Sequence, residues 1–273
     1  MNSKYLYHYT SFNGLQGILN DKAIRATHIR YLNDKKEFIY TCDMIKKLCP
    51  AGDNKVHGSI ETLIEIANSV KQSQNVIPFV ACFSEDGDLL SQWRAYCKYG
   101  DGYNLGFDFA HLAGHSGYDI DTKLVIQILK CIYEKEQQKN RVNNFIRKYW
   151  QILFEGLSFS NNHPQLSQCI GDFFVLASQL KNPSFWEEKE YRLVVFLPDN
   201  YYGFIKYRQG KSNVIPYINL DFAQGQKNIP AKIITVGPTS DFKLAFNMIG
   251  TSLKSKNMSC CNLEKTESSY REI

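Results

Sequence analysis

Acidic and basic side chains alternate just before an apolar stretch in the last third of the chain. Glu188, Glu190 and Arg192 stand at every second position, and the branched and aromatic run 193–197 follows them. The run predicts a buried strand, and strand alternation would turn the three charged side chains toward one face. Buried charges are costly unless they are paired or used. The segment therefore predicts either an ion-paired strand end, with Glu190 and Arg192 neutralising each other, or a catalytic carboxylate site.

The residues around this segment carry two further patterns. Ser184 and Glu187 have the spacing of a capping box, which predicts one short helical turn before the strand. Glu187, Glu188 and Lys189 resemble the carboxylate and lysine set of metal-dependent nucleases, in which two carboxylates hold Mg²⁺. The second carboxylate would come from Asp86 or Asp88. The pattern is short and frequent by chance, so a nuclease is the alternative.

A histidine lies near the end of a strand predicted at the N-terminus. Aromatic and polar residues alternate over residues 4–10, and helical spacing follows over residues 12–19, with Ser11 or Asn13 as the cap. The strand would deliver His8 and Thr10 to the mouth of a strand-to-helix turn, where ligands of α/β folds commonly bind. A packed core or surface histidine is the alternative for His8.

The next segment predicts a phosphate contact and a helix cap. Arg25 lies in a short strand at residues 24–28, and a guanidinium can hold a phosphate through two hydrogen bonds. Asn33 or Asp34 is expected to cap a helix that reaches about Leu48. An exposed arginine is the alternative for Arg25.

Aromatic residues and an arginine gather before a glycine turn in the middle of the chain. Residues 89–96 predict a helix of about two turns, and residues 103–108 predict a strand. Trp and Tyr rings offer stacking surfaces, and an arginine offers several donors. The candidates are Trp93, Arg94, Tyr96 and Tyr103. A tryptophan that fills the core is the alternative.

The order of these elements predicts one α+β domain over residues 1–273, built on a mixed sheet. Further strands are expected near residues 76–83, 124–129, 214–218 and 233–236, and a helix at 242–254. Residues 134–180 read as a mostly helical insertion packed on one side of the sheet. We see no repeat, low-complexity segment or clear linker.

Composition indicates a globular protein without a metal site. The chain has 273 residues. Its net charge of +5 is below that of a strong nucleic-acid binder. Its eight cysteines form no CxxC pair, so a zinc site is not expected. No signal sequence or membrane-spanning apolar run is evident, so we expect a cytoplasmic protein with reduced thiols, no membrane partner and no metal.

Taken together and in order, these clusters resemble a bacterial family of unknown function whose members often lie near phage-defence genes. The resemblance covers nearly the whole chain, and the ordered set is specific although each motif alone is weak. The residues that carry it are His8-Tyr9-Thr10, Asn33-Asp34 with Glu37, Phe83-Ser84, Gln92-Trp93-Arg94, Gly102 with Gly106-Phe107-Asp108, Glu188-Lys189-Glu190-Tyr191-Arg192, Gly237-Pro238 and Ser269-Tyr270-Arg271.

That family in turn is similar to the mono-ADP-ribosyltransferases, including toxins that modify DNA or RNA. The resemblance implies that His8 and Thr10 grip NAD as the substrate, and that Glu190 contacts the nicotinamide ribose. Glu188 would act as general base on an acceptor. The full set expected around NAD is His8, Tyr9, Thr10, Arg25, Trp93, Arg94, Tyr96 and Tyr103. The ring that stacks on nicotinamide stays open between Tyr9, Tyr31, Tyr96 and Tyr103.

The resemblance implies an NAD-dependent toxin or effector of anti-phage defence. Its acceptor would be DNA, RNA or a protein, and its control a phage-protein trigger or an antitoxin. The carboxylate would stabilise an oxocarbenium-like centre without a metal. Besides the nuclease, a non-catalytic sensor that binds a nucleotide or a phage protein is the third hypothesis.

Overall fold

A branched β-sheet runs through the protein, as seen in a computed structural model that describes residues 4–32, 37–49, 57–63, 78–96, 100, 102–118, 124–155, 165–197, 202–210, 213–223, 225–239, 241–258 and 261–268. The strands are β1 (Tyr5–Ser11), β2 (Ala23–His28), β3 (Phe79–Ser84), β4 (Gly102–Asp108), β5 (Gly117–Tyr118), β6 (Val125–Lys130), β7 (Glu190–Phe196), β8 (Lys206–Gln209), β9 (Val214–Asp221), β10 (Ile233–Val236) and β11 (Asn262–Lys265). Their main path is β11-β10-β4-β1-β3-β2-β9-β8, and β7, β6 and β5 continue from the other edge of β3. The β10–β11 pair is parallel, so the sheet is mixed.

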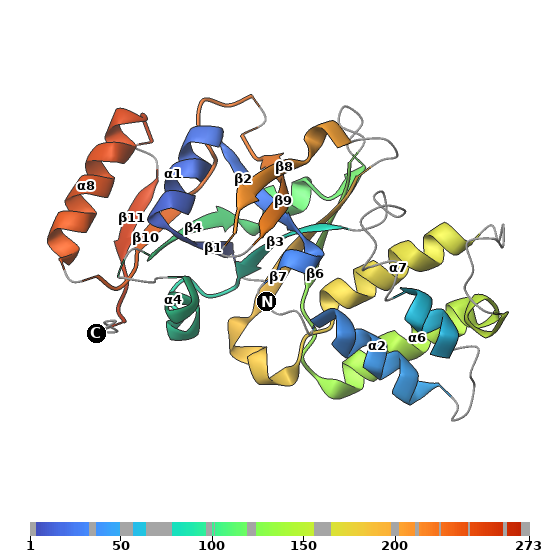
Figure 1. Ribbon diagram of the computed structural model, residues 1–273. Helices are drawn as coiled ribbons and strands as arrows, with labels where there is room; N and C mark the ends of the chain where they lie inside the picture. The colour runs from blue at the N-terminus through green and yellow to red at the C-terminus, as the bar shows by residue number, and fades with distance from the viewer. Residues whose placement is uncertain are drawn as a thin grey trace.

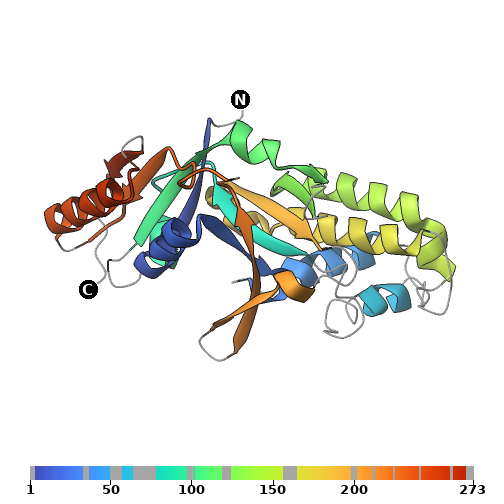
Figure 2. The ribbon, with the colours of Figure 1, turned by 90° about the horizontal axis from the view of Figure 1, so that it is seen from above.

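Helices cover the sheet and form a layer beside it (Figure 1). They are α1 (Phe12–Asp21), α2 (Glu37–Leu48), α4 (Leu90–Tyr96), α5 (Phe109–Gly114), α6 (Lys135–Glu155), α7 (Leu166–Gln179) and α8 (Phe242–Ser255), with 3₁₀ turns η1 (Ile29–Tyr31), η3 (Pro183–Glu188) and η4 (Tyr202–Phe204). Seen from above, α2, α6 and α7 lie together at one end, and the β8–β9 hairpin stands away from the sheet (Figure 2).

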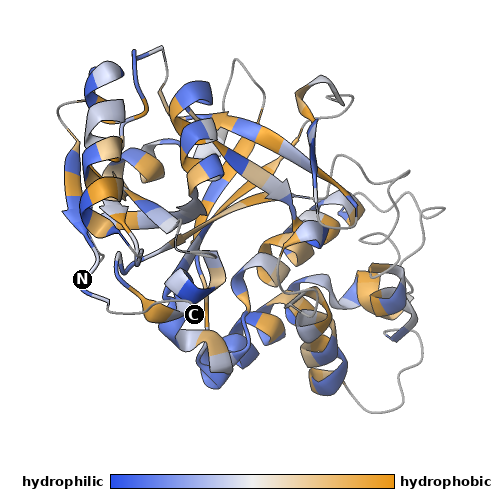
Figure 3. Ribbon diagram, turned by 60° about the vertical axis from the view of Figure 1, so that its left-hand side comes forward, coloured by the Kyte–Doolittle hydropathy of each residue, from blue (hydrophilic) through white to orange (hydrophobic). Residues whose placement is uncertain are grey.

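Two apolar cores hold these layers together. The first lies on the sheet and takes in buried residues of α1, α5 and α8, such as Leu15, Leu112 and Leu253. The second lies between α2, α6 and α7 and is centred on aromatic residues such as Phe173 and Phe174. Figure 3 shows the apolar and polar stripes of the long helices that make such packing favourable.

The sheet branches at β3. On one edge β3 pairs along its length with β7, from Phe79 opposite Val195 to Ser84 opposite Glu190. On the other edge β1 meets β3 only at Ser84, and β2 meets it only at Val80 and Phe79. Residues 81–83 therefore have no strand partner on that edge in the described part of the chain, and the sheet is split there.

The expected α+β class and mixed sheet are confirmed, and most expected elements occur. Residues 135–155 and 166–179 are helical, as predicted for the insertion, but α2 packs with them into the same core. The strands β8 and β11 were not predicted. Asn33 and Asp34, the expected caps of α2, lie outside the described residues.

One cap was assigned to the wrong residue. The Oδ1 atom of Asn182 accepts the hydrogen bond from the Ser184 amide at 3.0 Å, so Asn182 caps η3 and Ser184 does not. The turn then ends at Lys189, which has a left-handed φ of 45°, and β7 begins with Glu190. Glu188 thus belongs to the turn and not to the strand.

Candidate functional site

His8 is a residue of β1 and borders the split between β1 and β2. Its Nδ1 atom is 2.8 Å from the carbonyl oxygen of Cys82, one of the β3 residues that lack a strand partner there. Since a carbonyl oxygen only accepts, Nδ1 carries the proton and Nε2 is an acceptor, with no hydrogen bond from any described residue. Burial lowers the pKa of His8, so the ring is neutral near pH 7. His8 thereby replaces a missing strand partner and offers an acceptor to a ligand.

Glu190 is the centre of a buried charged network on the opposite edge of β3. Its carboxylate accepts from Arg192 Nε at 2.9 Å and from Nη2 at 3.0 Å, a two-bond contact between side chains that are 7% and 2% exposed. Burial raises the pKa of Glu190, but the Arg192 and Lys181 cations outweigh burial and lower it overall. Glu190 is therefore a carboxylate held in its charged form, as the ion-paired alternative expected.

Lys181 joins the two candidate carboxylates. Its ammonium contacts Glu188 Oε2 at 2.5 Å and also Glu190 Oε2, although Lys181 itself is 7% exposed. Glu188 is 24% exposed, so it is the carboxylate of the network that solvent can reach. The sum of the four formal charges, two carboxylates and two cations, is zero, which keeps the network compatible with burial.

Two thiols complete the surroundings of Glu190. Cys131 Sγ lies 3.8 Å from Glu190 Oε2, and the Cys82 thiol, on β3, is close enough for the charge of this carboxylate to act on it. Burial, followed by the charge of Glu190, raises the pKa of Cys82 well above its ordinary value. Cys82 therefore stays protonated and is not a nucleophile. Through its carbonyl and its thiol, Cys82 connects His8 with Glu190.

Tyr96, at the end of α4, is the candidate aromatic residue whose pKa responds to the charges of this network. Burial, the Cys82 thiol and the Glu190 carboxylate raise the pKa of Tyr96. The side chain is only partly buried, and it has interactions within the protein. It therefore combines nearness to the carboxylates with some access from outside.

The other expected stacking residues are packed into the protein. Trp93 is fully buried and donates from Nε1 to Asp88 Oδ1 at 2.6 Å, and Tyr9 packs edge-on against it with ring centroids 4.7 Å apart. The Tyr9 hydroxyl donates to the carbonyl of Asp86 at 2.9 Å and accepts from the Leu89 amide at 3.0 Å. As placed, Tyr9 and Trp93 hold the β3–α4 connection against the sheet and present no ring face to a ligand, which corrects the expectation for both.

The motif glycine Gly237 belongs to this same packed cluster. A Cβ atom at Gly237 would lie 2.8 Å from the Trp93 ring, so the close approach requires glycine. Asp88 also accepts from Thr266 Oγ1 and, at 2.6 Å, from the Glu267 amide. With three donors already bound, Asp88 is a structural carboxylate.

Three other expected contacts are found in the sheet core, on α4 and beside α1. Tyr103 is 7% exposed in the sheet core, and Arg94 lies on the exposed side of α4. The Thr10 hydroxyl is packed against Gly14 of α1, where a Cβ atom would lie 1.8 Å from it. The structure thus brings Tyr96, Glu188 and Glu190 together near the Cys82 thiol, whereas His8 reaches the Cys82 carbonyl from the other face of the sheet, where it packs against Phe83.

Arg25 lies on β2 beside two residues that the sequence did not single out. Its guanidinium is 5.0 Å from the centroid of the Tyr217 ring and 3.3 Å from Asp21. Burial and the Arg25 charge lower the pKa of Arg208, which comes from β8 and bonds to Thr27 at 3.5 Å. Two guanidinium groups and an aromatic ring therefore gather at the β2 side of the split, a combination suited to a phosphate and a flat ring.

The sequence also missed Lys181 as a member of the charged network. Lys181 follows a helix and precedes the turn that contains Glu188, so no strand or helix spacing relates it to Glu190. A single lysine before an Asn-Pro pair carries no motif of its own. Its role becomes visible only when η3 folds back and places Glu188 beside β7.

The proposed nuclease ligands do not gather around one point. Lys189 Nζ does lie 3.0 Å from Asp86 Oδ2, so the two chain segments meet as that hypothesis required. Asp88, however, is bound within the Trp93 cluster, and Glu188 is paired with Lys181. Among the described residues no group of three or more His, Cys, Asp or Glu side chains is placed to hold a metal ion.

Comparisons with known proteins bear on the same segment. Residues 92–193 match the family described as "Protein of unknown function (DUF2971)". The match begins in α4 and ends in β7, so it contains Trp93, Tyr96, Lys181, Glu188 and Glu190. It supports the expected similarity to a domain family of unknown function. No curated protein and no solved structure matches the chain.

The helices of the described ranges are all too short or too polar to cross a membrane.

Proposed function

We propose that the protein is an NAD-consuming enzyme of the mono-ADP-ribosyltransferase type, with its site at the split edge of β3. The observation that carries the proposal is the convergence on Cys82 of two groups from opposite edges of β3. His8 approaches its carbonyl oxygen at 2.8 Å, and the charge of Glu190 acts on its thiol. A neutral acceptor and charged carboxylates beside an open strand edge are the parts such chemistry needs.

NAD would lie along the split, from the arginines to the carboxylates. Arg25 and Arg208 supply charge for its phosphates, and the Tyr217 ring, 5.0 Å from Arg25, offers a surface at that end. Along β3, Val80 pairs with Thr27 and Cys82 lies two residues further on, a separation of about 7 Å at 3.4 Å per residue. A dinucleotide is long enough to reach both ends.

Glu188 is the carboxylate we assign to the reaction centre. It is 24% exposed, compared with 7% for Glu190, and Tyr96 lies next to the same network. The bond between ribose C1′ and the nicotinamide nitrogen breaks, and its electron pair leaves with nicotinamide. An acceptor nucleophile forms the new bond to C1′ and gives its proton to Glu188, whose charge also stabilises the oxocarbenium-like centre.

Glu190 is then a positioning residue and not the group that touches the sugar. Both of its oxygens are bound, one by Arg192 and the other by Arg192 and Lys181. By fixing Lys181, it fixes the ammonium that orients Glu188. The acceptor (DNA, RNA or protein) and a role in anti-phage defence belong to the proposal and rest on the motif resemblance alone.

Incubation with NAD labelled in the adenylate part tests the reaction. Purified protein with DNA, RNA or cell lysate should release nicotinamide and label one of these fractions, and EDTA should leave the rate unchanged. Cutting of nucleic acid that requires Mg²⁺ would instead favour the nuclease. Binding of NAD or a nucleotide without nicotinamide release would favour the sensor, and either result would overturn the transferase.

A further inference from the structure

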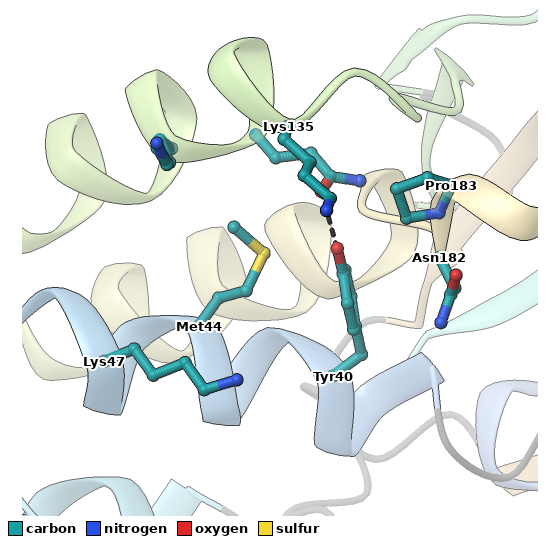
Figure 4. A pocket seen from close by; sticks show the side chains of 8 residues that line it. Tyr40, Met44, Lys47, Lys135, Asn182 and Pro183 are labelled. Atoms are coloured by element: carbon teal, nitrogen blue, oxygen red, sulfur yellow. Dashed lines mark hydrogen bonds between the residues drawn. The ribbon is translucent and has the colours of Figure 1, made fainter.

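A basic cavity lies in the helical layer, between α2, α6 and the start of η3. Its volume is about 420 Å³, and it is lined by Tyr40, Met44, Lys47, Lys135, Gln138, Lys139, Asn182 and Pro183. This volume falls within the range of small-ligand pockets, about 300–1,000 Å³. In Figure 4, Lys135 reaches from α6 toward the Tyr40 hydroxyl, and Lys47 extends along α2.

The cavity lining has a formal charge of +3 and contains no carboxylate. Lys139 is paired with Glu136 at 2.7 Å, but we see no carboxylate partner for Lys47 or Lys135 among the described residues. All three lysines are exposed, and their like charges on two helices favour an anion over a cation in the cavity. The charge of the cavity therefore selects for an anionic ligand.

The back wall of the cavity is rigid and its polar groups are satisfied. Gln138 is fully buried, and its Nε2 donates to the carbonyls of Ile132 at 2.6 Å and Lys181 at 2.7 Å. Its Oε1 accepts from the Tyr40 hydroxyl at 2.7 Å. Tyr40 is thus held with its ring beside Met44 in the lining, which gives a ligand a flat apolar surface next to the lysines.

We propose that this cavity binds a small organic phosphate of mononucleotide size. The phosphate would lie between Lys47 and Lys135, which approach from facing helices, and the body of the ligand would lie against Tyr40, Met44 and Pro183. Lysine ammonium groups bind phosphate as point charges, so two of them from different elements suit a terminal phosphate. The site is separate from the split and does not depend on the proposed reaction.

The cavity is also connected to the charged network through the backbone. Gln138 binds the Lys181 carbonyl, while the Lys181 amide donates to Ile132 at 3.2 Å. The Lys181 side chain ends at Glu188 and Glu190. A ligand that steadies Tyr40 and Asn182 therefore also steadies the segment that holds Lys181.

Calorimetric titration of the full chain with AMP, adenosine and inorganic phosphate tests the site. AMP should bind, phosphate should bind more weakly, and adenosine should show no measurable binding. Lys47→Ala and Lys135→Ala should each weaken AMP binding about 10-fold or more, as expected for the loss of a charged hydrogen bond. Lys139→Ala should have a smaller effect because Lys139 is already paired with Glu136.

Two controls make the result specific. Lys243→Ala removes an exposed lysine of α8, outside the cavity lining, and should leave AMP affinity unchanged. Arg25→Ala separates this cavity from the split, because AMP bound at the split would be lost in Arg25→Ala and kept in Lys47→Ala. That pattern, or no AMP binding at millimolar concentration, overturns the proposal.

Hydrogen exchange locates the ligand independently of affinity. AMP should slow the exchange of the Lys181 amide in the wild type and should not slow it in the Lys47→Ala/Lys135→Ala double variant. Slowing that survives in the folded double variant would also overturn the proposal, since the ligand would then be bound elsewhere.

Discussion

The cluster around Trp93 and the network around Glu190 are both buried and both contain motif residues, but they differ in charge. The Trp93 cluster contains one carboxylate, Asp88, and its donors are an indole, a hydroxyl and a backbone amide. The Glu190 network contains two carboxylates and two cations within hydrogen-bond distance. The first arrangement joins chain segments while burying a single charge. The second requires desolvation free energy for each of its buried charges.

This contrast explains why the same motifs should be divided between stability and function. Buried charges are retained where they are used, and sites of catalysis are where several charges share a small volume. The aromatic motif residues hold the β3–α4 connection, and the charged ones gather at the start of β7, on the other edge of β3 from the split. The predictions below separate these two roles, beginning with the largest expected effect.

Glu190→Gln should lower the free energy of unfolding by about 3–5 kcal/mol, because it leaves Arg192 and Lys181 buried without their shared anion. Urea denaturation of the variant and the wild type measures this difference. Turnover should fall as well, since Lys181 loses one of its two contacts.

A triple replacement sharpens the same comparison. The variant Lys181→Met/Glu190→Leu/Arg192→Met removes all three buried charges together, so it should be more stable than Glu190→Gln and inactive. Equal or greater loss of stability in the triple variant would show that the network exists to stabilise the fold.

Glu188→Gln should reduce NAD turnover by about 10²–10³-fold, the usual effect of losing one preorganised electrostatic group. Its unfolding free energy should change by less than about 1 kcal/mol, because the Glu188 pair is partly exposed. Nicotinamide release and denaturation are measured on the same sample, with Glu136→Gln, another carboxylate paired to a lysine, as the control. Wild-type turnover in folded Glu188→Gln would remove Glu188 from the reaction centre.

Trp93→Phe should lower the free energy of unfolding by about 1–3 kcal/mol, through the lost bond to Asp88 and the smaller ring. NAD affinity of the folded variant should equal that of the wild type, since Trp93 is fully buried. Titration with NAD below the melting temperature checks this. A clear loss of affinity would restore Trp93 to the ligand site and erase the distinction between the two clusters.

The two clusters also differ in how far the sequence predicted them. The spacing of Glu188, Glu190 and Arg192 indicated the charged site because hydrophobic periodicity locates β7 nearby. The position of Glu188 was misjudged because the left-handed Lys189 ends a turn there, and turn geometry depends on tertiary contacts. For Trp93, composition alone could not tell a stacking ring from a core ring, since only burial separates them.

The fold shows the same limit. The strands β1, β2, β3, β4 and β7 were expected close to their observed positions because their residues are apolar or alternate clearly. The split at β3 was not predicted, because it depends on which strands β1 and β2 pair with. Hydrophobic periodicity locates strands but does not determine their pairing. The exposed strand β8 has no apolar face and gave no signal, yet it brings Arg208 beside Arg25.

The smallest expected effect concerns pH and separates His8 from both clusters. Burial lowers the pKa of His8 from its ordinary value of 6.5. Just below pH 6.5 the unfolded chain therefore binds a proton at His8 that the folded chain does not bind. The stability contributed by neutral His8 is therefore complete above about pH 6.5 and is lost as the pH falls through the lowered pKa.

His8→Gln keeps a side-chain donor for the Cys82 carbonyl but cannot titrate, so the stability of the variant should fall less steeply below pH 6.5. His28, whose pKa is lowered to about 4 by burial and by Arg30, and His111, whose pKa is lowered by burial and by His115, remain in both proteins and contribute to the residual slope. Melting temperatures measured between pH 7.5 and pH 4.5 provide the comparison; identical slopes would mean that His8 is already accessible to protons and does not seal the open edge of β3.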